Sequence, residues 1–424
     1  MNTKIRFSLA SAFIFILALS SAAMADSYHY KNIIIGDRAS GMGGAYTAIS
    51  DDPSGLFYNP AGIVYSQGTN VSASANAYHN TSKEYSNVLG GMGWSRKASS
   101  LLPNFFGVVQ KMGKGRFGLA YVVPDSIIED QDQVFHNLPT MYAGGTITDF
   151  YLNFNNDDST HLFGVGYARE VTDSFSWGLS LFYHHRRAQR ILNQTILFDD
   201  GQSEWTNTYY ESEEDGVMPV LGIMWTPAEK YSFGASVSKT IITGSRTAFQ
   251  GVAQLHPDNP AYTAPDAAFV TTSRTGEKRK YPLNANLGGA YFASETFMVS
   301  ADVNYYGSTR DENRLLDYER AWVVNFSLGT EYYYSPNLAL RAGLYSNMSA
   351  APEIKAGQDS VSEDDVDLIG LTASMSHFGR GSSLTLGMGY ATGSGDAQVS
   401  GNNTEIQDAS ISSWTVYLSN AYGF

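Results

Sequence analysis

Apolar and polar residues alternate with a period of two in many segments of this chain. In the last segment, residues 414–424, the even positions carry large apolar side chains except at Asn420, and the odd positions carry residues suited to a polar or tightly packed interior. Successive side chains of a strand point to opposite faces, so this alternation predicts strands with one apolar face. The same pattern recurs in residues 231–237, 297–305, 322–332 and 384–390.

The connections between these segments alternate between tight turns and long polar loops. Turn residues occur at 113–115, 171–174, 227–230, 294–296, 335–337 and 379–381. Longer polar stretches lie near 80–100, 125–158, 256–266, 308–318, 348–363 and 393–408. Short turns at one end and long loops at the other are typical of bacterial outer-membrane barrels, and the spacing predicts roughly fourteen strands. We therefore expect an all-β protein, a transmembrane antiparallel β-barrel formed by residues 69–424.

The first 25 residues have the three parts of a secretory signal peptide. Lys4 and Arg6 form a basic start, residues 7–19 are apolar, and Ala23-Met24-Ala25 provides a small-residue cleavage site. A transmembrane anchor is the alternative, but the apolar run is short for a span of about 20 residues. The pattern predicts export and a mature chain that begins at Asp26.

Residues 26–68 are expected to form a plug, or hatch, inside the barrel. A barrel of this size has a lumen wider than its own side chains can fill. Gly41, Gly43 and Gly44 give this segment backbone freedom. Asp51 and Asp52 precede Pro53 in a turn pattern. Pro60 fixes its own φ and keeps Asn59 out of the helical region.

Composition excludes several other classes of protein. Without Lys4 and Arg6, 25 of the 27 basic residues remain against 41 acidic ones, so the mature net charge of −16 argues against nucleic acid as a partner. The chain has no cysteine, hence no disulfide or thiolate metal site. Nucleophile-elbow, zinc-protease and phosphate-loop motifs are absent. The acidic loop residues are read as solvated charge rather than calcium ligands. We therefore expect no enzyme activity, no cofactor and no metal.

The N-terminal motifs resemble the hatch of the FadL/TodX family. The resemblance rests on the run from Arg38 to Ala45, the Asp51-Asp52-Pro53 turn, Asn59-Pro60-Ala61 and the terminal Phe424. It implies a monomer in the bacterial outer membrane, among lipids and lipopolysaccharide. It also implies passive uptake of long-chain fatty acids or related hydrophobic compounds through a hatch-gated barrel. The same pattern resembles related barrels that act as secretion shuttles or surface scaffolds, which is the alternative function.

The resemblance further implies an opening in the third strand, towards lipid. That strand would run from Arg116 to Val123, and Gly118 or Pro124 could interrupt its pairing. An extracellular apolar groove would bind the substrate first. Residues of the expected loops that could form the groove, with Lys97 beside the carboxylate, are Trp94, Phe135, Leu138, Met141 and Tyr142. Packing between loops is the alternative role for each of them.

Two groups of charged residues have expected structural roles. Alternation in the strand after Trp177 turns His184, Arg186 and Arg190 inward, and turns His185 and Arg187 outward to the level of lipopolysaccharide phosphates. A role at the surface or rim is favoured here over a ligand clamp. Arg341, Asp302 and Glu331 are expected to form ion pairs that line the wall or hold the hatch.

The alternation itself gives a test of the lipid-facing surface. Leu386→Arg should lower the free energy of unfolding by about 2–4 kcal/mol if the site is near the bilayer midplane. Gly387→Ser, on the opposite face, should cost much less. Denaturant titration of the barrel in lipid vesicles measures both values, and equal losses would mean that the two faces are assigned the wrong way round.

Overall fold

A computed structural model of the protein describes residues 28–139, 146–257, 268–276, 278–313, 316–355, 362–399 and 406–423. The expected signal peptide, Met141, Tyr142 and Phe424 lie outside these residues. No helix in the described part of the chain is long and apolar enough to cross a membrane.

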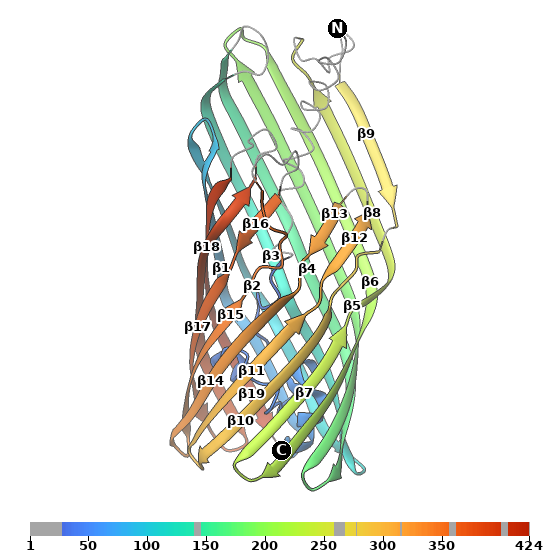
Figure 1. Ribbon diagram of the computed structural model, residues 1–424, viewed down its shortest axis with the longest axis vertical. Helices are drawn as coiled ribbons and strands as arrows, with labels where there is room; N and C mark the ends of the chain where they lie inside the picture. Colours follow the sequence, from blue (N-terminus) through green and yellow to red (C-terminus); the bar gives the residue numbers. More distant parts are fainter. Residues whose placement is uncertain are drawn as a thin grey trace.

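Antiparallel strands make up almost all of the described chain (Figure 1). The strands are β1 (Asn70–Leu89), β2 (Met92–Met112), β3 (Gly115–Pro139), β4 (Thr146–Thr172), β5 (Phe175–Phe198), β6 (Ser203–Ala228), β7 (Tyr231–Lys239), β8 (Ile241–Gln254), β9 (Ala268–Thr275), β10 (Leu283–Ser294), β11 (Phe297–Tyr306), β12 (Thr309–Asn313), β13 (Leu316–Arg320), β14 (Val323–Ser335), β15 (Leu338–Asn347), β16 (Ser362–Val366), β17 (Leu368–Phe378), β18 (Ser382–Gln398) and β19 (Gln407–Gly423). The helices are α2 (Asp37–Gly41), α3 (Gly55–Tyr58) and the 3-10 helix η1 (Pro60–Tyr65).

The wall is a closed barrel, as the alternation predicts. Within the described residues, fourteen strands pair in a ring, in the order β1 to β7, β10, β11, β14, β15, β17, β18 and β19. The pairing of β19 with β1 closes the ring. β8 and β9 extend the wall beyond β7, β16 extends it beyond β17, and β12 pairs with β13 in a separate hairpin. The predicted count of strands and the fold class are confirmed.

Exposure along the strands follows the same period of two. In β5, Trp177, Leu179 and Leu181 are exposed, whereas Ser176, Gly178 and Ser180 face the interior. Large apolar side chains on the outer face suit lipid. Small residues on the inner face leave room for the segment that occupies the lumen.

Three of the expected long loops are mostly strand, which corrects the sequence interpretation. β1 and β2 run through most of residues 80–100, β3 and β4 through most of 125–158, and β12 and β13 through most of 308–318. β4 has 27 residues, far more than the roughly 9–11 that cross a bilayer. Beyond the hydrocarbon, the outer face of a strand needs no apolar residues. The alternation therefore fades there, and a polar strand resembles a loop.

The hatch fills the end of the lumen near the short turns (Figure 1). Its buried apolar residues pack against the inner wall in two clusters. In one, Ile35, Leu56 and Ile63 contact a group that includes Phe105 and Phe182. In the other, Ala39, Met42, Tyr46, Ala48 and Ile49 pack with Ala290 and Met298.

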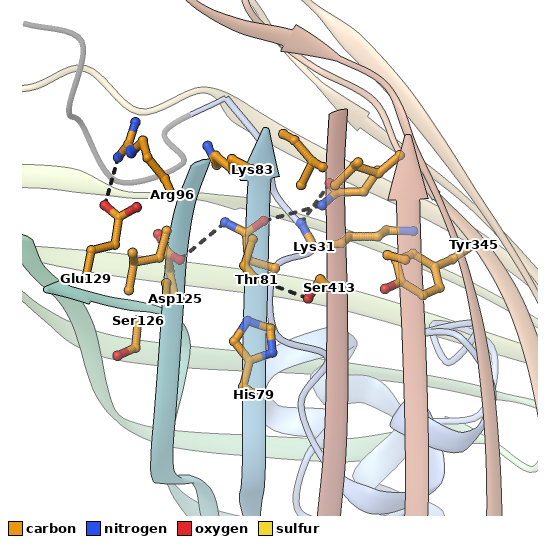
Figure 2. A pocket seen from close by; sticks show the side chains of 17 residues that line it. Lys31, His79, Thr81, Lys83, Arg96, Asp125, Ser126, Glu129, Tyr345 and Ser413 are labelled. Carbon is orange, nitrogen blue, oxygen red and sulfur yellow. Dashed lines mark hydrogen bonds and ion pairs between the residues drawn. The ribbon is translucent and has the colours of Figure 1, made fainter. Parts of the chain in front are cut away.

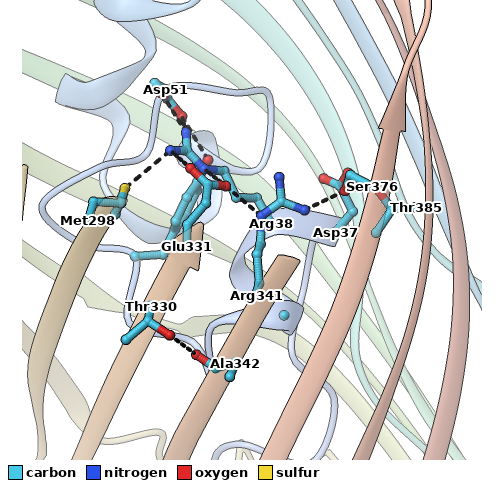
Figure 3. Close-up of polar contacts among 12 residues, drawn as sticks. Asp37, Arg38, Asp51, Met298, Thr330, Glu331, Arg341, Ala342, Ser376 and Thr385 are labelled. Atoms are coloured by element: carbon cyan, nitrogen blue, oxygen red, sulfur yellow. Dashed lines mark hydrogen bonds and ion pairs between the residues drawn. The ribbon is translucent and has the colours of Figure 1, made fainter. Parts of the chain in front are cut away.

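Arg38 ties the hatch to the wall through a buried ion network (Figure 3). Its guanidinium lies 2.7 Å from Asp51 Oδ2 and 2.6 Å from Glu331 Oε1. Arg341 of β15 also donates to Glu331, at 2.5 Å. Glu331 and Arg341 thus form the ion pair expected from sequence. Breaking a buried pair leaves an uncompensated charge, which typically costs about 3–5 kcal/mol.

Polar contacts hold the rest of the hatch. Asp302 of β11 accepts hydrogen bonds from the backbone N–H groups of Tyr46 (2.9 Å) and Thr47 (2.8 Å). Asp52 accepts from the backbone N–H of Ser54 at 2.7 Å. Burial, with the nearby Asp37 and Asp51 carboxylates, raises the pKa of Asp52 to about 6.

Asn59 joins three parts of the structure. Its side-chain amide donates to the carbonyls of Thr47 (2.8 Å) and Ile223 (3.0 Å), and its oxygen accepts from the N–H of Ala61 (3.2 Å). Pro60 opens η1, where its missing N–H costs nothing. Hatch, wall and helix start therefore meet at one fully buried side chain.

Two hatch glycines are needed for different reasons. Gly43 has a φ of +64°, which favours glycine. Gly41 has an ordinary φ, but a Cβ there would lie 2.1 Å from Ser374 Oγ. The helix can approach the wall only without that atom.

The surroundings of Gly387 correct the expectation that Gly387→Ser costs little stability. It faces inward, as predicted, but a Cβ there would lie 2.1 Å from the ring of Tyr417. Gly387→Ser is therefore not a benign control, because it would displace that ring. Leu386→Ile, which keeps an apolar side chain at the exposed position, is the better comparison for Leu386→Arg.

The contacts of Asn59 give a test of the plug. Asn59→Ala leaves two carbonyls and one N–H without their side-chain partner, which should destabilise the docked hatch by about 1–3 kcal/mol. The barrel should still assemble and show heat-modifiable migration in gels, while hydrogen exchange in residues 37–65 should speed up.

Gln67→Ala is the matched control, because Gln67 carries the same amide in an exposed position. Removing residues 26–62 should make planar bilayers that contain the barrel conduct ions. A closed, non-conducting barrel after that deletion would show that the hatch is not the plug.

Candidate functional site

A cavity of about 190 Å³ lies in the lumen above the hatch. Its apolar lining includes Phe57 of the hatch, Leu162 of β4 and Met218 of β6. Its charged and polar lining includes His184 and Arg186 of β5, with Arg279 and Arg320. An apolar surface with a few convergent polar groups is the usual form of a small-molecule site.

The charged residues around the cavity form a network of ion pairs and hydrogen bonds. Arg186 forms an ion pair with Asp158 and lies 3.3 Å from Glu214. Glu214 also accepts from Tyr281 Oη at 2.9 Å and lies 3.5 Å from Arg279 Nε. Within the residues that the structure describes, the buried Nε2 of His184 makes no hydrogen bond.

The histidine–arginine run of β5 therefore divides between the two faces of the wall. His184 and Arg186 face inward, as the alternation predicts, but they line the cavity, although the sequence favoured a surface or rim role. His185 and Arg187 face outward and pair with Asp215 (2.9 Å) and Glu211 (3.3 Å) of β6. The strand period identifies the inward pair, but it does not show what that pair lines.

A second, smaller cavity of about 40 Å³ lies beside the first (Figure 2). Its lining includes the buried ion pair of Arg96 with Glu129 (2.8 Å), and Lys83, which pairs with Asp364 (2.7 Å). Asn32 and Asp125 line both cavities, and Asn32 donates to Asp125 at 3.2 Å. This contact forms a thin partition between the two cavities.

The wall is interrupted beside this partition. β2 and β3 pair from Met112–Gly115 to Phe105–Val122, and they pair again at Ala98–Glu129. Residues 99–104 and 123–128 between these points are not paired with each other, although the register is the same on both sides. In that register Pro103 stands opposite Pro124, and proline has no N–H to donate to a ladder.

The two residues predicted for a lateral opening have different surroundings. Pro124 lies within the interruption, next to a bulge that shifts the pairing of β3 with β4. Gly118 lies in regular ladder, opposite Val109 and Gly166. It contacts the hatch instead, because a Cβ there would lie 2.7 Å from Leu56.

The predicted groove residues that the structure describes come together above the cavities. Trp94, Phe135 and Leu138 belong to one buried apolar cluster with Phe150 and Phe154. Their exposed fractions are 4%, 1% and 5%, so they form a packed cap rather than an open groove. Met141 and Tyr142 lie outside the described residues.

The cation beside this cluster is Arg96, which the sequence interpretation missed. Its guanidinium lies 5.4 Å from the Trp94 ring and 5.0 Å from the Phe154 ring. Lys97, the residue proposed from sequence, is exposed. Because successive side chains of a strand point to opposite faces, Arg96 lies on the same face as Trp94, and Lys97 lies on the opposite face. The alternation in the sequence therefore already indicated Arg96.

In the described ranges, no group of three or more His, Asp or Glu side chains is placed to hold a metal ion. Ion pairs and hydrogen bonds engage many of the charged groups of the lumen.

Comparison with solved structures identifies the same architecture in transport proteins. The toluene transporter TodX of P. putida matches with a TM-score of 0.66 at 15% identity, covering 92% of this chain and 98% of that one. A Pseudomonas aeruginosa FadL homologue gives 0.60 at 13%, covering 95% and 100%. The Ralstonia pickettii toluene transporter TbuX gives 0.60 at 13%, covering 92% and 98%.

Sequence similarity is detected with the profile of a family. A search of curated protein sequences found no match to this chain. The sequence profile of one family matches residues 16–409, nearly the whole chain. The protein therefore belongs to the outer membrane protein transport protein family (OMPP1/FadL/TodX), whose members carry hydrophobic compounds across the outer membrane.

Proposed function

We propose that this protein takes up long-chain fatty acids or related hydrophobic compounds by passive diffusion, as a monomer exported with a cleaved signal peptide. The observation that carries the proposal is the position of the larger cavity, which is lined by Pro124 and Asp125 at the interruption between β2 and β3. A molecule in the cavity thus has a short way to the surrounding lipid.

An apolar lining favours an acyl chain over water. Burial of each methylene contributes about 0.8 kcal/mol, so even a few methylenes against Phe57, Leu162 and Met218 would hold a substrate. Binding must also stay weak enough for release. A cavity of about 190 Å³ holds only part of a long chain, which is consistent with passage rather than storage.

The contacts of the hatch favour passage of the substrate sideways through the wall over passage along the barrel axis. Arg38, Asn59 and Asp302 link it to the wall by several buried contacts. A route through the periplasmic end would break all of them. A route through the wall needs only a local change near Asp125, so the substrate leaves while the hatch remains docked.

The charge of the cavity favours an acid over a neutral hydrocarbon. Its lining includes the cations Arg186, Lys239, Arg279 and Arg320 against the carboxylates Asp125 and Asp158, and Glu214 offsets a further charge by pairing with Arg186 and Arg279. The excess of positive charge can orient a carboxylate head group. The solved relatives TodX and TbuX are described as toluene transporters, and toluene has no such group.

Paired substrates test this function. Cells that lack their own transporter and express this protein should take up labelled oleate faster than labelled oleyl alcohol, since only oleate carries a carboxylate. Arg320→Gln should reduce oleate uptake several-fold and leave uptake of the alcohol unchanged. Lys97→Gln removes an exposed charge outside the cavity and is the matched control.

The outcomes separate the possible functions. Uptake of toluene without oleate would replace the fatty acid by an aromatic substrate. No uptake of any of the three compounds, in cells whose outer membranes contain the folded barrel, would favour the scaffold or secretion-shuttle alternative.

A further inference from the structure

The wall has a second interruption, at the junction of β7 and β8. β6 pairs with β7 as far as Val220–Ser238 and with β8 from Val217–Ile241. The residues between these pairs, Met218 and Pro219 in β6 and Lys239 and Thr240 opposite, are not paired with each other. The register is the same on both sides, which places Pro219 opposite Lys239.

The ladder on the other side of the same junction also ends here. β7 and β10 pair up to Lys239–Leu283, and β8 pairs with β9 from Thr247–Thr275 onwards. The register is the same for both pairs of strands, and it places Pro282 opposite Thr240, just past the last pair of the ladder between β7 and β10. Prolines thus flank Lys239 and Thr240 on both sides, as Pro103 and Pro124 face each other in the first interruption.

The chain that leaves the wall here turns towards the lumen. Tyr281 donates to Glu214 at 2.9 Å, and Arg279 Nε lies 3.5 Å from the same carboxylate. The Tyr281 ring meets the His184 ring edge-on, with centroids 5.2 Å apart. This segment therefore lines the cavity instead of completing the ladder.

One cavity contacts both interruptions. Its lining includes Pro124 and Asp125 at the first, and Lys239, Thr240 and Pro282 at the second. On the outer surface, Ile241 and Leu283 flank the second interruption and are exposed apolar residues. Lys239 is also exposed. An apolar rim with a cation suits an acyl chain that ends in an acidic head group.

We propose that the junction of Thr240 and Pro282 is a second lateral port. A single-chain amphiphile with an acidic head group enters the cavity there from the outer rim of the membrane, and the interruption between β2 and β3 serves as its exit. This route rests on the proposed uptake function. It bypasses the buried apolar cap around Trp94 and Phe135.

Cysteine chemistry tests the port, because the chain contains no cysteine of its own. The rate of oleate uptake by the Thr240→Cys protein before any treatment is the reference. Treatment of intact cells with a bulky apolar reagent, pyrene maleimide, should then modify the new thiol and reduce uptake several-fold. Mass spectrometry of the isolated barrel measures the extent of modification. If Thr240→Cys alone impairs assembly, Ser238→Cys lines the same cavity and replaces it.

Val237→Cys is the matched control, since Val237 lies on the same strand, faces outward and is paired with Ala285. Its modification should not change uptake. Full modification at position 240 with unchanged uptake would overturn the port, and so would a thiol at 240 that never reacts. Absence of oleate uptake by the untreated wild-type protein would instead refute the proposed function.

Discussion

Lipid offers no hydrogen-bond partners, so every backbone N–H and C=O that crosses the membrane must be paired within the protein. A closed antiparallel ring meets this requirement, and the pairing of β19 with β1 completes it. Prolines cannot donate to a ladder, and they cluster at the places where this ring is interrupted. Pro103 faces Pro124 at one interruption, and Pro219 and Pro282 flank the other. The same constraint that closes the barrel thus determines where its ladder is interrupted.

Closure also makes the hatch necessary. A ring of fourteen strands encloses more space than its own side chains fill, and residues 28–66 occupy one end of it. The hatch is held by buried charge and amide contacts at Arg38, Asn59 and Asp302. The larger cavity lies next to this hatch, and its lining includes residues at both interruptions of the ladder.

The sequence predicts the parts that obey a simple period. Alternation predicts the strand faces and the inward direction of His184 and Arg341, because lipid imposes one apolar face per strand. The spacing of turns and loops predicts the number of strands. Alternation fails where lipid does not reach, because the polar upper halves of β1 to β4 resemble loops. It also could not show that Trp94 and Phe135 pack into a closed cap, or that Pro124 faces Pro103. Those contacts depend on register between strands, which the pattern of a single strand does not contain.

The central claim is that substrate passes through the wall while the hatch stays in place. A disulfide between cysteines at positions 37 and 385 tests it directly, since Thr385 Oγ1 lies 2.9 Å from Asp37 Oδ2 and the chain has no other cysteine. The measurement is the rate of oleate uptake by cells that express the Asp37→Cys, Thr385→Cys protein, before and after oxidation. The account predicts equal rates in the two states. Uptake that stops on oxidation and returns with a reducing agent would show that the hatch must leave the lumen, and would contradict it.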